Sequence, residues 1–516
     1  MLDTKIKQQL KDVLGNLSSS FTLLVRRNAQ YERSAEFSEF VEEVAACSSR
    51  LSTVYEDGPD FRILLLRDGT DTGISFRGLP NGHEFTSLLL ALLNADGKGR
   101  NLPDEALSAR IRALRGPLKL TTYVSLTCTN CPDVVQALNV MALCNDRLTH
   151  EMVDGGLFQE EVTRLGIQSV PSVYLNGELL HIGRGSLGSL LEELEEKAGP
   201  DGGTQVAQVE HAFDVVVVGG GPAGAAAAVY SARKGLKVAV VAERIGGQVN
   251  DTTDIANLIA TPHTTGTRLA SDLRTHLEEY GVEIFDNRKV TAVDLQGREK
   301  RIDTRGGERF VAPAVIIATG ATWRRLGLPT EEQYIGRGIH FCPHCDGPFY
   351  KDKEVAVIGG GNSGVEAAID LAGICRRVTL LEFGEKLKAD EVLQQKARSL
   401  GNMRILTMAQ TTELLDDGQH LTGFKVKDRQ TEEVSVLHLD GVFVQIGLMP
   451  NSAVYKGAVP MTPRNEVIID AAARTAVPGV YAAGDVTTVP YKQITIAMGE
   501  GAKAALSAFD DRIKWG

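Results

Sequence analysis

Two stretches of the chain run from an apolar strand straight into a glycine turn and a helix of small residues. They read FDVVVVGGGPAG from Phe213 and EVAVIGGGNSGVEAA from Glu354. This order opens a βαβ unit of a parallel sheet, in which backbone N–H groups at the helix N-terminus face a pyrophosphate. The sequence therefore predicts an α/β protein with two Rossmann-like folds, each with a dinucleotide site.

The first loop has glycine wherever a Cβ atom would obstruct the turn, the phosphate or the helix: Gly219, Gly221 and Gly224. The next predicted strand, VAVVAE, ends at Glu243, where a carboxylate accepts hydrogen bonds from ribose hydroxyls. Strand, glycine turn, helix and acidic strand end together form the fingerprint of a dinucleotide site. We expect this site to bind FAD because of two segments farther along the chain.

Those segments are VIIATGATW at 315–323 and VYAAGDVTT at 480–488. Each is an apolar strand that ends in a glycine turn. In flavoproteins with two dinucleotide sites, such returning segments close the FAD domain around the ribityl chain and the pyrophosphate. An NADH domain inserted between them then splits the FAD domain in two. The candidate FAD ligands in these turns are Thr319, Gly320, Gly484 and Asp485.

The second loop indicates which nicotinamide nucleotide binds. Its glycines are Gly359, Gly361 and Gly364. The following strand, VTLLE, ends at Glu382, whose carboxylate accepts from the 2′-hydroxyl of NADH and repels the 2′-phosphate of NADPH. The neighbouring LLEFGEKLK holds no arginine pair for a phosphate, although Lys386 and Lys388 offer positive charge to one. We therefore expect NADH.

Four of the seven cysteines form two Cys-x-x-Cys pairs, Cys128 with Cys131 and Cys342 with Cys345. Two intervening residues place both sulfurs on one helix turn, so that one thiolate attacks a disulfide and the other resolves the product. Half of a zinc site is the alternative for a pair taken alone. The position of the second pair between two dinucleotide loops favours disulfide exchange, and no bound metal is expected.

The surroundings of each pair indicate how its thiols are tuned. Cys128 and Cys131 lie where a strand passes into a helix, whose N-terminus lowers the pKa of the first thiol more than that of the buried second one. Pro171, in SVPSV, matches the position where thioredoxin-like folds hold a cis proline. In HFCPHCDGPFY, His344 and Asp346 are placed to tune a thiolate or to carry a proton. The remaining cysteines are interpreted as small buried side chains without a redox role: Cys47, Cys144 and Cys375.

The N-terminal region predicts two thioredoxin-like copies. Residues 116–198 run as strand, Cys-x-x-Cys helix, strand, helix, the strand VPSVYLNGELL and an acidic helix. Residues 1–115 repeat this rhythm without a cysteine pair. The predicted domains are the thioredoxin-like copies at 1–115 and 116–198, a linker at 199–211, the first part of the FAD domain at 212–328, the NADH domain at 329–447 and the second part of the FAD domain at 448–516.

Composition argues against two classes of partner. The 516 residues include 55 Lys+Arg and 66 Asp+Glu, a formal net charge of −11, so the chain offers no excess of positive charge to nucleic acid or anionic lipid. No apolar run reaches the length that spans a bilayer, and the N-terminus, MLDTKIKQQLKDVLGNL, lacks the apolar region of a secretion signal. An odd number of cysteines argues against a structural disulfide framework. We expect a cytoplasmic protein.

Over essentially its whole length, the chain resembles the F-subunit family of bacterial alkyl hydroperoxide reductases. The resemblance lies in CPHCDGPFYKDKEVAVIGGGNSGVEAAIDLAG, GGGPAGAAAAVYSARKG, ERIGGQVNDT, CTNCPDVVQALN and AAGDVTTVPYKQI. The C-terminal portion alone is also similar to low-molecular-weight thioredoxin reductases. The additional N-terminal region with its own cysteine pair favours the F-subunit family.

This resemblance implies a homodimer that reduces the disulfide of a peroxiredoxin, the C subunit of the same system. Hydride passes from NADH to FAD, and electrons then pass to Cys342 and Cys345. Cys345 faces the isoalloxazine and Cys342 exchanges outward. Cys128 and Cys131 receive the electrons, and Cys128 attacks the disulfide of the partner.

The resemblance also implies roles that the residue pattern alone does not. Gly247 and Gln248, in ERIGGQVNDT, belong to the FAD site, and Glu84, in GHEFTSL, lies near the redox centre. Without the resemblance, Glu84 is interpreted as an exposed carboxylate at a helix start. Thr129 departs from the family, which often carries His between these cysteines, so the Cys128 pKa and exchange rate are expected to differ.

Three other functions remain as alternatives. A thioredoxin reductase would prefer free thioredoxin to a peroxiredoxin, and a hydrogen-peroxide-forming NADH oxidase would turn over with oxygen alone. A non-catalytic redox sensor would turn NADH over slowly with every acceptor and would bind its partner in a redox-dependent way.

Overall fold

The structure is a computed structural model that describes residues 4–28, 33–99, 102–128, 130–167, 169–199, 209–252, 255, 258–329, 331–335, 337–341, 343–417 and 420–515. The chain divides into two compact units. Unit 1 comprises Met1–Thr204 and Arg325–Ile446, and unit 2 comprises Gln205–Arg324 and Gly447–Gly516. Unit 2 therefore consists of two stretches of chain that flank the second stretch of unit 1. The limits predicted for the linker and for the NADH domain lie near these junctions, whereas the limit predicted at 115/116 falls inside unit 1; all of them remain predictions.

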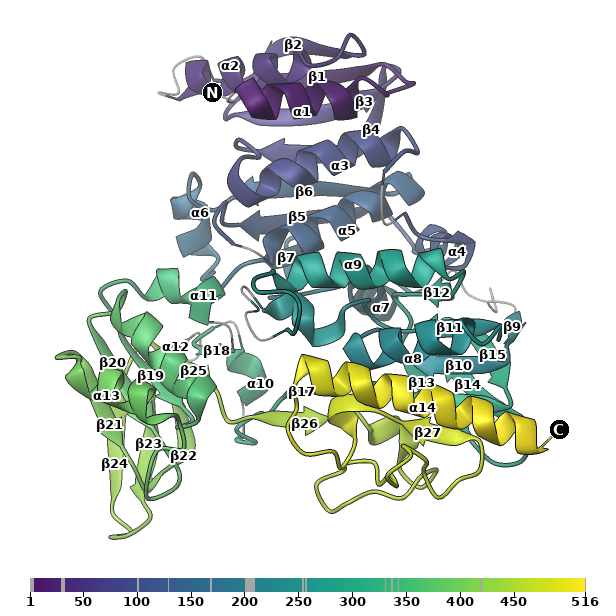
Figure 1. Ribbon diagram of the computed structural model, residues 1–516. Coiled ribbons are helices and arrows are strands. Elements are labelled where there is room, and N and C mark those ends of the chain that lie inside the picture. The colour runs from purple at the N-terminus through teal and green to yellow at the C-terminus, as the bar shows by residue number, and fades with distance from the viewer. Residues whose placement is uncertain are drawn as a thin grey trace. The chain divides into compact units, whose positions relative to one another are not determined.

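An eight-stranded sheet forms the N-terminal part of unit 1, in the order β2-β1-β3-β4-β6-β5-β7-β8 (Figure 1). Its strands are β1 (Phe21–Arg27), β2 (Leu51–Asp57), β3 (Arg62–Arg67), β4 (Thr70–Arg77), β5 (Leu118–Val124), β6 (Leu148–Asp154), β7 (Ser172–Leu175) and β8 (Glu178–Ile182). In each half, the first two strands are parallel and the next two pairings are antiparallel. The two halves thus repeat one topology, and the parallel pairing of β4 with β6 joins them into a single sheet.

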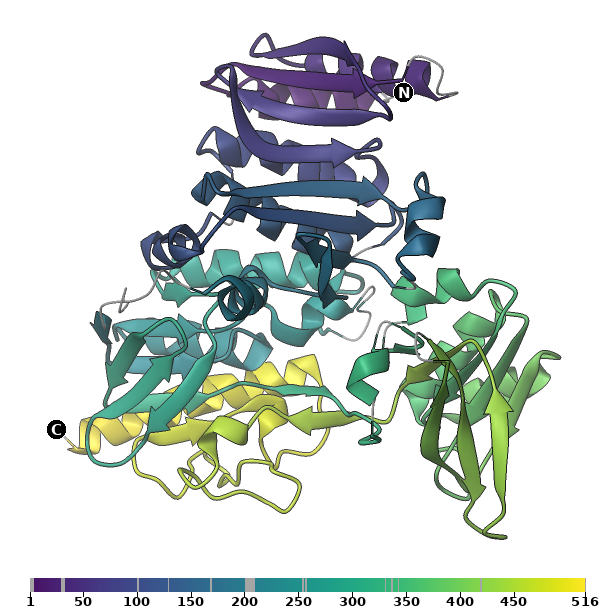
Figure 2. The ribbon, with the colours of Figure 1, turned by 180° about the vertical axis from the view of Figure 1, so that it is seen from behind.

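Helices cover one face of this sheet. The helices of this part are α1 (Thr4–Leu14), α2 (Ser34–Ala45), α3 (Phe85–Ala95), α4 (Glu105–Ala113), α5 (Cys131–Cys144), α6 (Gln159–Arg164) and α7 (Leu187–Ala198), and the 3-10 turn η1 (Gly82–Glu84) precedes α3. Helices α1, α3 and α5 lie in front of the sheet in Figure 1, and Figure 2 shows the strands from the other side. Strand β1 accordingly buries alternate residues, Phe21, Leu23 and Val25, against the helices.

Two predictions for this part were wrong or incomplete. The stretch VPSVYLNGELL is a hairpin of β7 and β8 and not one strand, because Asn176 and Gly177 adopt positive φ angles of 52° and 89° and turn the chain. Strand β2 was not predicted, although it supplies the parallel partner of β1. Its register places Leu51 opposite Phe21.

The second stretch of unit 1 contains a five-stranded parallel sheet in the order β18-β25-β19-β20-β21 and a three-stranded antiparallel sheet, β22-β23-β24. The strands are β18 (Ile339–His340), β19 (Glu354–Ile358), β20 (Arg377–Leu381), β21 (Met403–Leu406), β22 (Ala409–Asp416), β23 (Leu421–Asp428), β24 (Val434–His438) and β25 (Gly441–Val444). The helices are α10 (Glu331–Tyr334), α11 (Pro343–Asp346), the 3-10 helix η3 (Gly347–Tyr350), α12 (Asn362–Ala372) and α13 (Glu391–Ser399).

Unit 2 is built on a five-stranded parallel sheet, β12-β11-β10-β16-β27, and a four-stranded sheet, β13-β14-β15-β9. The strands are β9 (Val209–Ala212), β10 (Val215–Val218), β11 (Val238–Val241), β12 (Glu283–Phe285), β13 (Val290–Asp294), β14 (Lys300–Thr304), β15 (Glu308–Ala312), β16 (Ala314–Ile317), β17 (Ala321–Trp323), β26 (Leu448–Pro450) and β27 (Val480–Ala482). The helices are α8 (Pro222–Ala232), α9 (Gly266–Glu279) and α14 (Ile494–Trp515), with the 3-10 turns η2 (Gly247–Asp251), η4 (Ala453–Tyr455) and η5 (Gly484–Val486).

Strand β10 lies in the core of unit 2. Its four residues are all valine and all buried, as expected for a parallel strand covered on both faces. β27 pairs in parallel with β16, so the last part of the chain completes the sheet that β10 begins. The two Rossmann-like sheets and the thioredoxin-like topology confirm the predicted fold class. Among the described residues, no helix combines the length and apolar character of a membrane span.

Candidate active site

Four predicted FAD-binding segments follow neighbouring parallel strands of unit 2. The glycine loop follows β10, Glu243 follows β11, Thr319 follows β16, and Gly484 follows β27. Because β11, β10, β16 and β27 are adjacent and parallel, their carboxyl ends meet at one edge of the sheet. The fold therefore brings these segments together in the place where open α/β sheets bind dinucleotides.

The three glycines of the first loop have different tasks. A Cβ atom on Gly219 would lie 2.1 Å from the Ala318 carbonyl oxygen, and one on Gly224 would lie 1.9 Å from the Gly219 carbonyl oxygen, so both are required for close packing. Among the described residues, a Cβ atom on Gly221 would meet only the Gly246 carbonyl oxygen, at 3.9 Å. Gly221 is the N-cap of α8 and supplies no side-chain cap. The helix N-terminus thus faces open space, which fits a pyrophosphate.

The segment after β11 lies against this loop. The Gly246 N–H donates to the Gly220 carbonyl at 2.8 Å, and a Cβ atom on Gly247 would be 3.1 Å from the Gly221 Cα atom. Gln248 follows, half-buried, in η2, and Glu243 is exposed at the strand end. These positions allow Gly247 and Gln248 to contact a nucleotide held at Gly221.

The returning segments are fixed by hydrogen bonds. Thr319 donates through its hydroxyl to the Asn451 carbonyl at 2.6 Å, and the Asn451 side chain donates back to the Thr319 carbonyl at 2.9 Å. A Cβ atom on Gly484 would come within 2.9 Å of the Ala223 Cβ atom at the start of α8. Burial raises the pKa of Asp485, which the charge of Lys492 partly offsets. Asp485 is therefore a partly buried carboxyl beside the loop, as a hydrogen-bonding ligand of FAD requires.

The second loop has the same construction. A Cβ atom on Gly359 would lie 2.1 Å from the Gln445 carbonyl oxygen, and one on Gly364 would lie 1.9 Å from the Gly359 carbonyl oxygen. Gly361 caps α12 without a side chain, and a Cβ atom there would have no neighbour within 4 Å in the part of the chain that the structure describes. The space before this helix N-terminus fits the pyrophosphate of a second nucleotide.

Glu382 directly follows β20, one residue beyond the predicted strand end, and its carboxylate is largely occupied by hydrogen bonds from the glycine loop and the next turn. Oε2 accepts the Gly360 N–H at 2.8 Å, and Oε1 accepts the Gly384 N–H at 2.7 Å. The side chain is 6% exposed, and Lys388 Nζ approaches Oε1 at 3.8 Å. Each carboxylate oxygen retains a second lone pair for a ribose hydroxyl. The structure thus adds a loop-shaping contact to the predicted recognition of ribose.

The structure describes the surroundings of the pair at 342 and 345 only in part. Cys342 lies outside the described residues, and so do the side chains of His344 and Cys345. Asp346, at the end of α11, is buried, and its Oδ2 lies 3.0 Å from Nδ1 of His340, outside the angular range of a hydrogen bond. Nε2 of His340 forms a 2.7 Å hydrogen bond with the Tyr350 hydroxyl. Asp346 therefore borders a buried polar cluster.

Cys128 and Cys131 are free thiols at the start of α5. The Cys131 backbone N–H donates to the Cys128 sulfur at 3.2 Å. A hydrogen bond from the Cys131 thiol, aided by backbone N–H groups, lowers the pKa of Cys128. Burial, followed by the interaction with Cys128, raises the pKa of Cys131 well above its usual value. The predicted direction of the pKa difference between the two thiols is confirmed, and the lower pKa favours Cys128 as the attacking thiol.

The bond before Pro171 is cis, an isomer that the sequence did not determine. The carbonyl oxygen of Val170 lies 3.8 Å from the Cys128 sulfur. Thr129, the departure from the family pattern, lies outside the described residues. The proline segment therefore borders the nucleophilic thiol directly.

Glu84 is not the exposed carboxylate that its sequence pattern alone predicts. It is fully buried in η1, ahead of α3. Burial raises its pKa to about 7, against a hydrogen bond from Ser87, and its charge in turn raises the pKa of Cys131. The copy without a cysteine pair thus places an acid beside the redox pair of the other copy, as the resemblance implied.

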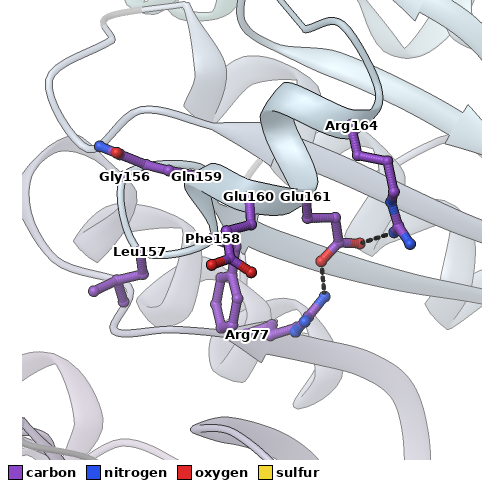
Figure 3. A pocket seen from close by; sticks show the side chains of 8 residues that line it. All are labelled: Arg77, Gly156, Leu157, Phe158, Gln159, Glu160, Glu161 and Arg164. Atoms are coloured by element: carbon purple, nitrogen blue, oxygen red, sulfur yellow. Dashed lines mark hydrogen bonds and ion pairs between the residues drawn. The ribbon is translucent and has the colours of Figure 1, made fainter.

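A separate cavity of about 750 Å³ opens beside α6 (Figure 3). Within it, Arg77 Nη1 contacts Glu161 Oε2 at 2.7 Å, and the Arg77 guanidinium packs over the Phe158 ring at 4.0 Å from its centre. The lining consists of Arg77, Gly156, Leu157, Phe158, Gln159, Glu160, Glu161 and Arg164. None of the predicted site residues lines it.

Comparison with known proteins agrees with this geometry. The model of the pyridine nucleotide-disulphide oxidoreductase family matches residues 213–501, and a thioredoxin domain model matches residues 119–196. The F subunit of alkyl hydroperoxide reductase from Pseudomonas putida is 49% identical over 100% of this chain and 99% of its own length. Its counterpart of the same name from Escherichia coli (strain K12) is 47% identical over 100% and 99%. The chain belongs to the F-subunit family of alkyl hydroperoxide reductases.

As a member of this family, it is an NADH-dependent flavoprotein disulfide oxidoreductase that uses FAD. The crystal structure of T. acidophilum thioredoxin reductase aligns with 58% of this chain and 99% of that chain, with a TM-score of 0.54 and 38% identity. The part of this chain that aligns with the reductase is about as long as residues 213–501, which the oxidoreductase family model matches. The N-terminal redox region is thus what distinguishes this F-subunit family member from such a reductase.

Sequence reasoning missed three residues of the site in this F-subunit family member. His340 and Tyr350 are the first and last residues of the HFCPHCDGPFY motif. Their side chains form a hydrogen bond, and the His340 ring contacts Asp346. Ser169 begins the SVPSV segment and donates to Asp346. All three lie within the HFCPHCDGPFY and SVPSV motifs, but residue spacing alone does not indicate that they gather around Asp346.

Proposed function

We propose that this chain reduces the disulfide of a peroxiredoxin, the C subunit of an alkyl hydroperoxide reductase, at the expense of NADH. Electrons reach the peroxiredoxin through Cys342 and Cys345 and then through Cys128 and Cys131. The observation that carries the proposal is the N-terminal pair: a thiol of lowered pKa, with a backbone N–H on its sulfur and the Val170 carbonyl beside it, in a chain with two nucleotide loops.

The nucleotide loops supply the first half of this path. Bound FAD accepts hydride from NADH and releases electrons in pairs to a disulfide. Gly221 and Gly361 leave their helix N-termini open to the two pyrophosphates, and Thr319, Gly484 and Asp485 close the FAD side. Glu382 favours NADH because a second negative charge, the 2′-phosphate of NADPH, would face its carboxylate.

The N-terminal pair performs the last exchange. The Cys128 thiolate attacks one sulfur of the peroxiredoxin disulfide, the S–S bond breaks, and the leaving sulfur takes a proton. The Cys131 thiol then gives up its proton and attacks the Cys128 sulfur, which forms the Cys128–Cys131 disulfide and frees the second peroxiredoxin thiol. Glu84, with a pKa of about 7, is placed to accept the Cys131 proton.

The assembly and location are part of the same proposal. A homodimer is expected from the family resemblance, and size-exclusion chromatography with light scattering tests it. The free thiols of Cys47, Cys144 and Cys375 suit a reducing compartment such as the cytoplasm. We expect the N-terminal region to move between its electron donor and the peroxiredoxin. Of the linker predicted at 199–211, residues 200–208 lie outside the described structure and Val209 begins β9.

The test is NADH oxidation by the purified protein with hydrogen peroxide, with and without a two-cysteine peroxiredoxin. Wild type should turn over only with the peroxiredoxin, and Cys128→Ser should lose this turnover. Cys144→Ser, which removes a half-buried thiol away from the pair, is the matched control and should retain it. Turnover by Cys128→Ser with oxygen alone would instead identify an NADH oxidase. Preference for free thioredoxin would identify a thioredoxin reductase.

A further inference from the structure

The loop at 169–171 contacts both redox stretches of unit 1. The Ser169 hydroxyl donates to Oδ1 of Asp346 at 3.0 Å. The next residue, Val170, places its carbonyl oxygen 3.8 Å from the Cys128 sulfur. Asp346 directly follows Cys345 in the chain. One short loop therefore connects the nucleophilic thiol of one pair to the residue that adjoins the other pair.

The hydrogen bond between Ser169 and Asp346 is buried and well supported. Ser169 is 3% exposed and Asp346 is 8% exposed. Ser172 donates through its hydroxyl to the Ser169 carbonyl at 2.7 Å, which fixes the backbone on the far side of Pro171. A hydroxyl that donates to a buried carboxylate makes a strong, charge-assisted contact. Loss of either partner leaves the other desolvated and unpaired, which is costly.

Further interactions connect the same two parts of unit 1. Nε2 of His420, next to β23, lies 3.4 Å from the Gly166 carbonyl oxygen. The charge of Arg337 partly offsets the rise that burial imposes on the pKa of Tyr174 in β7. These interactions come from segments far apart in sequence, so Ser169 belongs to a contact surface and is not an isolated hydrogen bond.

We propose that Ser169 is a positioning residue, which docks the N-terminal redox region on Asp346 for disulfide exchange between the two cysteine pairs. This inference rests on the proposed function. In the exchange, the pair beside Asp346 passes from dithiol to disulfide while Cys128 and Cys131 pass from disulfide to dithiol. Two electrons and two protons cross, and no other reactant is needed. Ser169 acts through Asp346 and touches neither the nucleotides nor the peroxiredoxin.

The experiment compares full-length wild type with Ser169→Ala in anaerobic rapid mixing with NADH, followed by flavin absorbance and by NADH oxidation with peroxiredoxin. Flavin reduction should keep its rate. Transfer to the N-terminal pair, and turnover with peroxiredoxin, should slow by roughly 10- to 100-fold, the factor that one hydrogen bond to a charged group provides. Ser34→Ala, which removes a buried hydroxyl that has no hydrogen-bond partner in the described structure, is the matched control and should behave as wild type.

The same substitution made in an Asp346→Ala protein separates docking from a merely structural effect of Ser169→Ala. In Asp346→Ala, the acceptor is absent, so adding Ser169→Ala should cause no further loss of transfer rate. The proposal would be overturned if Ser169→Ala slowed transfer in the Asp346→Ala protein as much as it does in the wild-type protein. It would also be overturned if Ser169→Ala and Ser34→Ala transferred electrons between the pairs at the same rate. Either result leaves the proposed function standing if Cys128→Ser still abolishes peroxiredoxin reduction. If wild type does not reduce peroxiredoxin, the proposed function itself fails.

His420→Ala tests the contact surface independently, with His438→Ala on the neighbouring strand as its control. The first variant should slow transfer between the pairs and leave flavin reduction unchanged. The second, an exposed histidine at the end of β24, should change neither rate. Equal transfer rates in the two variants would contradict docking through this surface.

Discussion

The Ser87 hydroxyl donates a 2.6 Å hydrogen bond to Oε2 of Glu84 in the interior of the thioredoxin-like region. The other carboxyl oxygen of Glu84 is buried and has no hydrogen-bond partner within the described part of the chain. One satisfied oxygen does not compensate for the loss of water, so the pKa of Glu84 rises to about 7. Glu84 therefore changes its charge near neutral pH, and it does so where its charge acts on Cys131.

Glu84→Gln should remove an ionisation near pH 7 from the pH profile of peroxiredoxin reduction. Below pH 7 the carboxyl is protonated and cannot accept the Cys131 proton, so the wild-type rate should rise with pH through this range. The variant should lack the rise and run at least about ten-fold slower at pH 8, since a positioned base contributes this much or more. Steady-state rates from pH 5.5 to 9 measure it. Glu178→Gln, an exposed carboxylate on β8, is the control, and a persisting inflection in Glu84→Gln would rule out the assignment.

His150 should make the N-terminal region sensitive to acid. Its ring contacts Asn139 Oδ1 at 2.7 Å and Thr122 Oγ1 at 2.8 Å, and burial lowers its pKa to about 3. Because the folded pKa is depressed, the unfolded chain binds a proton below about pH 6.5 while the folded one does not. The stability that neutral His150 contributes is complete above that pH and declines as pH falls, by about 3 kcal/mol at about pH 4.5.

Urea unfolding monitored between pH 7.5 and 4.5 tests this contribution. His150→Gln should be less stable than wild type at pH 7.5, because it disturbs the buried hydrogen bonds, yet it should lose less stability on acidification. His438→Gln, which changes an exposed histidine, should keep the wild-type slope. Parallel curves for His150→Gln and wild type would show that His150 does not set the acid sensitivity.

Alanine at Gly221 and at Gly361 should separate the two nucleotide sites. Both glycines have negative φ angles, −74° and −81°, so alanine fits the backbone, and its Cβ atom would project into the space before the helix N-terminus. Gly221→Ala should purify with less flavin, measured by absorbance after denaturation. Gly361→Ala should retain flavin and show a KM for NADH that is higher by roughly ten-fold or more. Each variant serves as the control for the other, and flavin loss in both would contradict the assignment.

Replacement of Glu382 should affect both binding and selectivity. Glu382→Gln keeps one acceptor oxygen but loses the charge, so one of the N–H groups of Gly360 and Gly384 would face an amide NH₂. The KM for NADH should rise, and the preference for NADH over NADPH should fall by roughly ten-fold. Ratios of kcat/KM for the two nucleotides measure this change. Glu385→Gln, exposed in the same turn, should leave the ratio unchanged.

The nucleotide loops were predictable because their glycines obey local steric rules. Gly219, Gly224, Gly359 and Gly364 are required wherever a strand, a tight turn and a helix pack this closely, whatever else the chain does. The direction of the pKa difference between the Cys128 and Cys131 thiols was predictable from their order at the helix start, although its largest causes are the hydrogen bond from Cys131 to Cys128 and the burial of Cys131. Local geometry therefore made the fold class and much of the candidate site predictable from the sequence.

Burial and long-range contacts were not predictable in this way. Glu84 has the sequence surroundings of an exposed helix start, and only the pairing of the two copies makes it an interior acid. The contact between Ser169 and Asp346 joins residues 177 positions apart. The hairpin at Asn176 and Gly177 is a different case, because Asn-Gly is a local turn signal and the sequence contains it. The prediction of one continuous strand there was wrong despite that signal.

The parallel pairing of β4 with β6 makes the two copies depend on each other. A chain cut between the copies would expose the backbone of β6 along its length, and an unpaired strand edge is a template for aggregation. It would also deprive Cys131 of its acidic neighbour. The copy that lacks a cysteine pair is thus required by its neighbour, and the two copies form one module rather than two.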